Sequence, residues 1–151
     1  MGNELKFITK LHKSSSRDYV QRMINEKSKC MGIAKNYSYD YWDGERKYGY
    51  GGYKYIKNHF KEMALNIITE YQLSENSKVL DIGCGKGYLI YEIKKILPNI
   101  KIQGLDISEY AINNCKEEIA DLLYIHDISK QTKYFDKELD LVLTFGCLHN
   151  L

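Results

Sequence analysis

A glycine-rich string carries the residues of this 151-residue sequence that are best suited to bind a ligand. Residues 79–87 read Val-Leu-Asp-Ile-Gly-Cys-Gly-Lys-Gly, an apolar run that passes into alternating glycines. A strand that ends in such a turn lets a ligand approach bare backbone at the carboxyl edge of a parallel sheet. The nicotinamide fingerprint G-x-G-x-x-G does not fit, because its third glycine would fall on Tyr88 or Ile90. A nicotinamide-dependent oxidoreductase is therefore the less favoured alternative, which a titration with NADH would test.

Three carboxylates follow three consecutive apolar runs. Asp81 lies two residues before Gly83, Asp106 closes the second run, and Asp127 follows the third. An acid at the end of the second strand is placed to accept both hydroxyls of a ribose, and an acid after the third could accept from an exocyclic amine. A pyrophosphate favours helix N-terminal N–H groups without a nearby carboxylate, whereas a cationic ligand suits the carboxylate. The pattern predicts a pocket for a positively charged adenosine derivative.

The elements that must position these residues alternate between strand and helix from residue 78 onward. We expect strands at 78–82, 100–105, 122–125 and 139–145. One helix is expected to begin at Tyr88 and to stop before Pro98, and another to run from an N-cap at Ser108 to about Ile119. Such alternation implies βαβ units with right-handed crossovers. The predicted fold class is α/β, with a Rossmann-like open parallel sheet.

The first half of the sequence has a different character. Apolar spacing predicts two amphipathic helices, one from residues 14–16 to Ala34 and one at about 55–71. We expect the first to pack on the rest of the domain, and a helix on a membrane surface is less favoured because its polar face mixes both charges. Between them lies the aromatic segment, residues 36–55, with seven of the 14 tyrosines, the only tryptophan and four glycines. Those glycines predict a turning loop. We therefore divide the chain into an N-terminal helical and Tyr/Gly-rich extension, 1–77, and a core, 78–151.

Charge and cysteine content narrow the function classes further. Residues 1–61 carry a net charge of +7 and residues 62–151 carry −5, which sum to the +2 of the whole chain. The basic residues are dispersed among acids, so a solvated helix face explains them at least as well as a nucleic-acid surface. The four cysteines lack metal-ligand spacing, and we expect no metal site. Without an apolar run long enough for a signal peptide or a membrane span, we expect reduced thiols in the cytoplasm.

Residues 78–151 resemble the first half of the class I S-adenosylmethionine-dependent methyltransferase family. The resemblance is carried by the nucleotide loop at 81–87, Leu-Asp-Ile-Ser at 105–108, His-Asp-Ile at 126–128 and the fourth-strand motif at 139–151. It implies a sheet with strand order 3-2-1-4 and S-adenosylmethionine as the cofactor. It also implies methyl transfer to an acceptor that the sequence does not identify, with a small molecule favoured over a nucleic acid.

The resemblance also implies a set of cofactor-binding residues. These are Asp81, Gly83, Cys84, Gly85, Gly87, Asp106, Ile107 and Asp127. Within this set Asp106 would hold the ribose, and Asp81 with the glycines would hold the methionyl part. Asp127 would contact the adenine, although a carboxylate at that position could equally cap a turn.

Catalytic residues are less well defined, because displacement at a sulfonium methyl needs alignment and desolvation but no covalent nucleophile. His149, after the fourth strand, and Tyr53 are the candidates, and Tyr48 and Tyr50 could border the methyl group with Tyr53. Aromatic residues could form a cage for a sulfonium, stack on a flat substrate, or simply seal the end of the sheet. An RNA-facing surface is less favoured, because no RNA-binding module is recognisable.

The family's sheet has seven strands, whereas this sequence ends after the fourth. We expect Leu141–Phe145 to form an apolar edge strand through which copies could associate. An alternative function is therefore a truncated, catalytically inactive cofactor-binding remnant or partner-binding fragment. Binding of S-adenosylmethionine without turnover to S-adenosylhomocysteine would favour that alternative.

Overall fold

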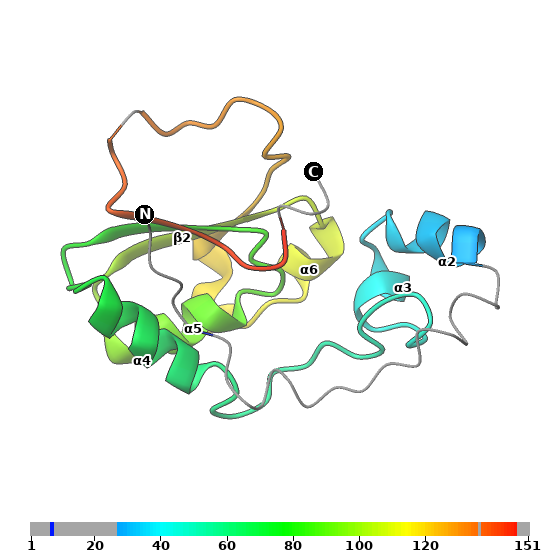
Figure 1. Ribbon diagram of the computed structural model, residues 1–151, viewed down its shortest axis with the longest axis horizontal. Helices are drawn as coiled ribbons and strands as arrows, with labels where there is room; N and C mark the ends of the chain where they lie inside the picture. Colours follow the sequence, from blue (N-terminus) through cyan, green and yellow to red (C-terminus); the bar gives the residue numbers. More distant parts are fainter. Residues whose placement is uncertain (1–6, 8–26, 136, 148–151) are drawn as a thin grey trace, which may run out of the picture.

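Four parallel strands form the sheet from which the rest of the structure is built (Figure 1). The computed structural model describes residues 7, 27–135 and 137–147. The strands are β1 (Lys78–Ile82), β2 (Lys101–Asp106), β3 (Leu123–Ile125) and β4 (Leu141–Thr144). They pair in the order β3-β2-β1-β4, and every pairing is parallel. The predicted α/β class and the strand order are both confirmed.

The helices α4 (Lys61–Glu70) and α5 (Tyr88–Ile96) cover one face of the sheet (Figure 1). The register places Val79 beside Ile102, so these side chains share that face. The buried cluster between sheet and helices contains Met63, Ala64, Ile67, Val79, Ile90, Ile93, Ile102 and Leu143. Because α4 lies before residue 78, the N-terminal part of the chain contributes to the same core as the strands.

The opposite face of the sheet is crossed by the connection between β3 and β4, whose described residues are 126–135 and 137–140 (Figure 1). Leu80 and Leu105 alternate with the core residues of their strands and are buried on this side. The hydroxyl of Tyr134 donates a hydrogen bond of 2.6 Å to Oε1 of Gln103 on β2. The connection is thereby fastened to the sheet by a side-chain contact.

The helix predicted from Ser108 to about residue 119 is shorter than expected. Ser108 is its N-cap, because the Ala111 N–H donates to Ser108 Oγ at 3.0 Å. The helix α6 (Glu109–Asn113) then ends, and a separate 3-10 helix, η1 (Glu117–Leu122), follows. Asn114 closes α6 by donating from its side chain to the Tyr110 carbonyl at 2.8 Å. Asparagine commonly ends helices in this way, because its side chain forms hydrogen bonds with nearby backbone groups that compete with those of a continuing helix.

The N-terminal helices also differ from the prediction. Of the first predicted helix, residues 14–26 lie outside the described residues, and the described part is α2 (Lys27–Ala34). No residue of α2 is buried, and its neighbour is α3 (Tyr39–Trp42), a single turn inside the aromatic segment, so packing on the core is not observed there. The helix predicted to begin near residue 55 begins at Lys61, because left-handed backbone at Asn58 (φ 65°) interrupts it.

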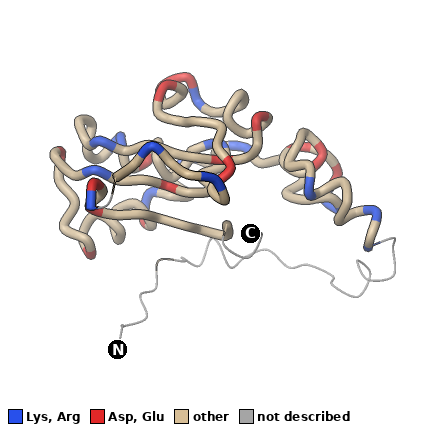
Figure 2. The backbone as a smooth tube through the Cα atoms, turned by 90° about the horizontal axis from the view of Figure 1, so that it is seen from above, with Lys and Arg blue, Asp and Glu red and all other residues tan. Residues whose placement is uncertain are grey.

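The excess of positive charge in the first part of the sequence persists among the described residues, where 27–61 carry eight Lys and Arg against three Asp and Glu. Figure 2 shows these basic residues spread along the backbone, with acidic residues between them from α3 onward. A surface that binds nucleic acid through its phosphates is expected to concentrate basic residues on one face. The RNA-facing alternative stays the less favoured prediction.

A substitution at Gly104 tests the packing between β2 and α5. A Cβ at this position would lie 2.6 Å from Cys84 Sγ and 2.6 Å from Ile90 Cδ1, so Gly104→Ala overfills the core. We expect it to lower the free energy of unfolding by about 1–3 kcal/mol in urea denaturation. Gly32→Ala is the matched control, because nothing lies within 4 Å of a Cβ there and Gly32 is inside a helix. The control should stabilise the chain by about 0.5–1 kcal/mol, and equal losses in both variants would contradict the packing.

Candidate functional site

A pocket opens at the carboxyl ends of the four strands. Its empty volume is about 710 Å³, counting the part that is open to solvent. Residues that follow each strand line it, and the opposite wall comes from Tyr37, Tyr41, Trp42 and Tyr50. This is the edge at which open parallel sheets bind ligands.

Asp106 is the carboxylate at the centre of this pocket. Its Oδ2 accepts a hydrogen bond of 2.7 Å from the Gly85 N–H, and its Oδ1 accepts one of 2.8 Å from the Ser108 N–H. Burial raises the pKa of Asp106 above its ordinary value, although the N–H donors of Ser108 and Gly85 oppose that rise. A carboxylate can accept about four hydrogen bonds, so Asp106 keeps acceptor capacity for a ligand in the pocket it lines.

Asp81 lies behind the pocket, one strand away from Asp106. It is buried on β1, between Gly104 of β2 and Leu143 of β4 in the register of the sheet. Desolvation, and then repulsion from Asp106, raise the pKa of Asp81 to about 7. The side chain is therefore close to half-protonated at neutral pH, and a positive charge placed nearby would favour its ionised form.

The glycine loop is packed more tightly than the sequence suggested. Gly83 and Gly85 both have left-handed backbone, with φ values of 73° and 58°. A Cβ at Gly83 would lie 2.6 Å from Cys147 Cβ, and one at Gly85 would lie 2.8 Å from Trp42 Cη2. The expected bare-backbone notch is thus partly covered by Trp42 and Cys147. Glycine is therefore needed at both positions because the neighbouring side chains leave no room for a Cβ, whether or not a ligand is bound.

The eight predicted cofactor residues fall into two groups. Four line the pocket: Gly83, Asp106, Ile107 and Asp127. The others lie behind it: Asp81, Cys84, Gly85 and Gly87. Cys84 Sγ lies 2.6 Å from the position of a Cβ on Gly104, and Ile119 Cδ1 lies 2.7 Å from that of a Cβ on Gly87, so both residues pack toward the core.

A buried ion pair fastens the aromatic segment to the glycine loop. Lys86 Nζ lies 2.6 Å from Asp43 Oδ2, and the two side chains are only 5% and 18% exposed. The Tyr110 hydroxyl donates to the same oxygen at 2.7 Å, and the Tyr53 N–H donates to Oδ1 at 2.9 Å. Burial alone would raise the pKa of Asp43, but the hydrogen bonds from Lys86 and Tyr110 outweigh it and lower the pKa. Sequence reasoning missed this pair, whose one signal was a lysine inside the glycine loop.

Trp42 forms a second attachment between the aromatic segment and the site. Its Nε1 donates to Ser108 Oγ at 2.8 Å and to the Tyr37 carbonyl at 3.1 Å. Its ring stacks on Tyr50, with centroids 5.3 Å apart and an interplanar angle of 6°. Tyr41 meets Trp42 edge to face, with centroids 5.1 Å apart. The aromatic wall of the pocket is therefore a packed cluster that is hydrogen-bonded to the N-cap of α6.

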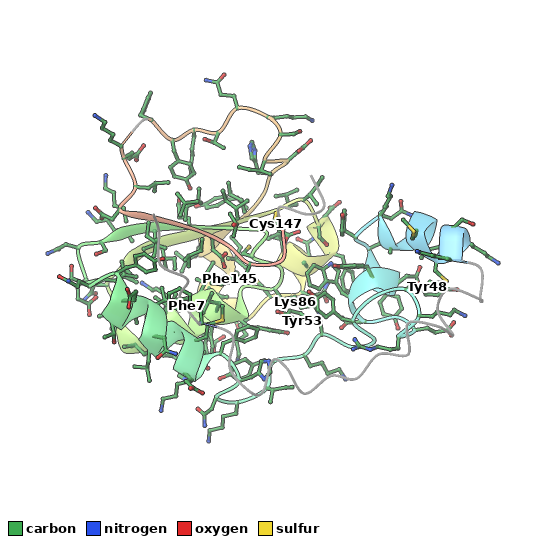
Figure 3. All side chains as sticks on the ribbon, in the orientation of Figure 1. Phe7, Tyr48, Tyr53, Lys86, Phe145 and Cys147 are labelled. Carbon is green, nitrogen blue, oxygen red and sulfur yellow. The ribbon has the colours of Figure 1, made fainter. Side chains whose placement is uncertain are left out.

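Neither candidate catalytic residue is among the described residues that line the pocket. Tyr53 packs between Trp42 and Tyr88, both with centroids 5.2 Å away, and burial raises the pKa of its hydroxyl. Figure 3 shows Tyr48 beside α3, away from Cys147 and Phe145 at the end of β4. Of the three tyrosines expected to border a methyl group, Tyr50 alone lines the pocket. His149 lies outside the described residues.

The described residues contain no group of three or more His, Cys, Asp or Glu side chains that could hold a metal ion. No helix in this part of the chain is long and apolar enough to cross a membrane.

Comparison with known proteins gives several matches to methyltransferases. The candidate methyltransferase 235L of Invertebrate iridescent virus 6 is 31% identical over 84 residues, which are 55% of this chain and 31% of that protein. Malonyl-[acyl-carrier protein] O-methyltransferase 1 of Ilyobacter polytropus is 28% identical over 97 residues, 64% of this chain and 35% of that protein. The chain therefore spans about a third of the length of these relatives. Among solved structures, the plantazolicin methyltransferase BpumL in complex with SAH matches with a TM-score of 0.45 and 24% identity, over 81% of this chain and 50% of that one.

The family comparison covers the strands and the pocket residues that follow them. A family model described as "Methyltransferase domain" matches residues 73–151, which are more than half of the chain. The cofactor of this family is S-adenosylmethionine. The chain therefore belongs to the class I S-adenosylmethionine-dependent methyltransferase family.

Proposed function

We propose that this protein transfers the methyl group of S-adenosylmethionine to a small-molecule acceptor. The observation that carries the proposal is the pocket itself, where Asp106 lies opposite an aromatic wall at the carboxyl edge of the sheet. Among the described residues, its lining includes the carboxylates of Asp106 and Asp127 but no Lys or Arg. A pocket of that charge favours a cationic ligand over a phosphate-bearing one.

The residues present fit the cofactor at its ribose. Asp106 is held rigidly by the N–H groups of Gly85 and Ser108, so its remaining acceptor sites are fixed in orientation. A carboxylate at the end of the second strand is the group that commonly accepts ribose hydroxyls in nucleotide-binding α/β folds. In our proposal Asp106 holds the ribose, and Gly83 and Ile107 complete the wall around it.

The residues also fit the charge of the cofactor. When bound, S-adenosylmethionine supplies an electrophilic methyl group on a sulfonium ion. Asp81 carries a carboxylate whose ionisation is suppressed by desolvation and by Asp106. A cation near the glycine loop would relieve that suppression, because an opposite charge stabilises the ionised acid. We propose that Asp81 stabilises the cationic part of the ligand from behind the pocket.

The aromatic wall is suited to alignment and desolvation. Trp42 is buried and Tyr41 is half-buried, and their packing with Tyr50 fixes the shape of the wall. Rings at this position exclude water and attract a positive charge through their faces. In this mechanism the protein holds and desolvates the reacting groups, and none of its side chains forms a covalent bond to the methyl group.

The second candidate function is a cofactor-binding remnant or a partner-binding fragment without turnover. The observation that favours it is β4, which pairs with β1 on one side and leaves Val142 exposed among the described residues. An apolar edge strand is a site at which another chain can pair. The two functions separate by calorimetry with S-adenosylmethionine followed by an assay for S-adenosylhomocysteine, because only the enzyme forms that product. The free thiols of Cys84, Cys115 and Cys147 fit a reducing, cytoplasmic compartment in either case.

Substitution of Asp106 tests the ribose assignment. Asp106→Asn removes the charge and turns one acceptor into a donor, so charge-assisted hydrogen bonds to the ribose are lost. We expect binding of S-adenosylmethionine to weaken by about 1–3 kcal/mol in calorimetry. The matched control is Asp121→Asn, an exposed carboxylate on η1, which should leave the affinity unchanged. An unchanged affinity in Asp106→Asn, with thermal unfolding like that of the control, would contradict the assignment.

The raised pKa of Asp81 gives a pH dependence that distinguishes charged from neutral ligands. Below pH 6 Asp81 is mostly protonated and neutral, and above pH 8 it is mostly ionised, since its pKa is about 7. The ratio of the Kd of neutral S-adenosylhomocysteine to that of cationic S-adenosylmethionine should therefore rise about three- to tenfold from pH 6 to pH 8.

The isosteric variant Asp81→Asn has no charge to gain over that range. Its ratio should stay flat with pH when both ligands are titrated in the same buffers. A ratio that rises equally in the wild type and in Asp81→Asn would show that another group senses the charge.

A further inference from the structure

The aromatic segment, residues 36–55, covers a part of the glycine loop that a cationic ligand would have to approach. A Cβ on Gly85 would lie 2.8 Å from Cη2 and 3.2 Å from Cζ3 of Trp42, so the indole ring lies directly against this glycine. Trp42 is itself buried, with an exposed fraction of 6%. In the proposed function Asp81 stabilises a positive charge near this loop. The Gly85 face of the loop becomes accessible to a ligand only when the indole ring moves away.

Polar contacts of Trp42 and of its neighbour Asp43 hold the indole ring in this place. Trp42 Nε1 donates to Ser108 Oγ at 2.8 Å. Asp43 Oδ2 accepts from Nζ of Lys86, a residue of the glycine loop, at 2.6 Å. The ion pair therefore joins the aromatic segment to the same loop that Trp42 covers. Because both charges are largely buried, the loss of either one would leave the other unpaired and would weaken the attachment.

The backbone at the start of the aromatic segment is strained while the segment is docked. Tyr37 has a φ of 47°, in the left-handed region that a bulky residue rarely adopts. Its carbonyl accepts from Trp42 Nε1 at 3.1 Å and from the Ser108 hydroxyl. These hydrogen bonds oppose the strain only while Trp42 stays against the loop. Movement of the indole ring away from Gly85 would release this strain, which reduces the free energy needed to undock the segment.

The surroundings of the aromatic segment allow it to move as a unit. Helix α2 has no buried residue, and Figures 1 and 2 show the stretch with α2 and α3 at one end of the molecule, outside the layers formed by the sheet, α4 and α5. Within the segment, backbone hydrogen bonds join Tyr50 to Tyr41 at 2.8 Å and Tyr53 to Trp42 at 3.0 Å. The segment is therefore braced internally by its backbone, whereas its attachment to the glycine loop depends on side-chain contacts.

We propose that residues 36–55 form a lid that the Asp43–Lys86 pair holds closed over the glycine loop, and that S-adenosylmethionine enters and leaves only when this lid opens. The inference rests on the proposed function for the identity of the ligand. Opening of the lid does not require the ligand, so it can be measured on the free protein. The alternative is a fixed wall, which stays in place while a ligand binds beside it in the part of the pocket that is already open.

Trp42 reports on the lid directly, because it is the only tryptophan of the chain. Acrylamide quenches the fluorescence of an indole that solvent can reach, so quenching measures how often the ring leaves the glycine loop. We expect quenching to increase in Asp43→Asn and in Lys86→Met, because each leaves one buried charge unpaired in the closed state. The double variant Asp43→Asn/Lys86→Met lacks the ion pair without an unpaired charge and should also be quenched more than the wild type. The matched control is Glu45→Gln, which breaks an exposed ion pair with Lys47 in the same segment and should be quenched like the wild type.

A second measurement follows ligand binding by stopped-flow, with S-adenosylhomocysteine as the probe and the fluorescence of Trp42 as the signal. Where opening limits entry, the observed rate constant of the wild type levels off at high ligand concentration. We expect that plateau and the dissociation rate constant to rise by about tenfold or more in Asp43→Asn, whereas Kd changes less than either rate constant. Glu45→Gln should keep the rate constants of the wild type.

The outcomes separate the lid from the proposed function. If the wild type does not bind S-adenosylhomocysteine, the proposed function fails and the lid has no role for this cofactor, but increased quenching in the ion-pair variants still demonstrates that the segment opens. If all three ion-pair variants are quenched like Glu45→Gln, the segment is a fixed wall and the lid is overturned. Increased quenching with unchanged binding rates would show that the ligand enters without passing under the segment, which also overturns the inference. Where a single variant loses the far-UV circular dichroism of the wild type, the double variant decides, because it has no unpaired buried charge.

Discussion

The carboxylate of Asp106 is the contact on which the geometry of the pocket depends. It joins the loop after β1, through the Gly85 N–H, to the loop after β2, through the Ser108 N–H. Ser108 in turn caps α6 and accepts the indole N–H of Trp42. A single buried acid thus helps to fix the relative positions of the glycine loop, the first turn of α6 and the aromatic wall. Hydrogen bonds to a buried carboxylate are among the stronger ones in proteins, which makes this relation well defined.

The aromatic segment belongs to the site because a buried charge pair holds it there. Removing Lys86 and Asp43 from water is unfavourable, and it is offset because Asp43 also accepts from Tyr110 and from the Tyr53 backbone. Breaking one partner would leave the other charged and buried, so the segment docks in one arrangement. The division of the chain at residue 77 was based on sequence composition. The pocket combines both sides of that division, because its aromatic wall comes from residues before residue 77.

The parts of the structure that could be predicted are those determined by neighbouring residues in the sequence. Short apolar runs predicted the four strands, and Ser108 predicted the start of α6, because each signal is local. The end of α6 was missed, since Asn114 sits within an otherwise helical pattern. The Lys86–Asp43 pair and the packing of Trp42 on Gly85 join residues 43 apart in sequence, and no periodicity encodes such contacts. The same limit explains why the pattern of glycines suggested an open notch where Trp42 and Cys147 lie.

The two buried carboxylates beside the pocket, Asp81 and Asp106, are electrostatically unfavourable when both are ionised, and a suitable ligand can reduce this free-energy cost. Asp81 and Asp106 share a desolvated region, and their mutual repulsion adds to the burial that keeps Asp81 close to half-protonated at neutral pH. A proton on Asp81 is one way to lower this cost, and a fixed positive charge near the glycine loop is another. Because both compete for the same negative charge, binding of a cation should release a proton from the protein near neutral pH. A neutral ligand of the same shape offers no such exchange. In the proposed function, the chain would thus distinguish a sulfonium from a sulfide without direct contact between the two charges, since Asp81 lies behind the wall of the pocket.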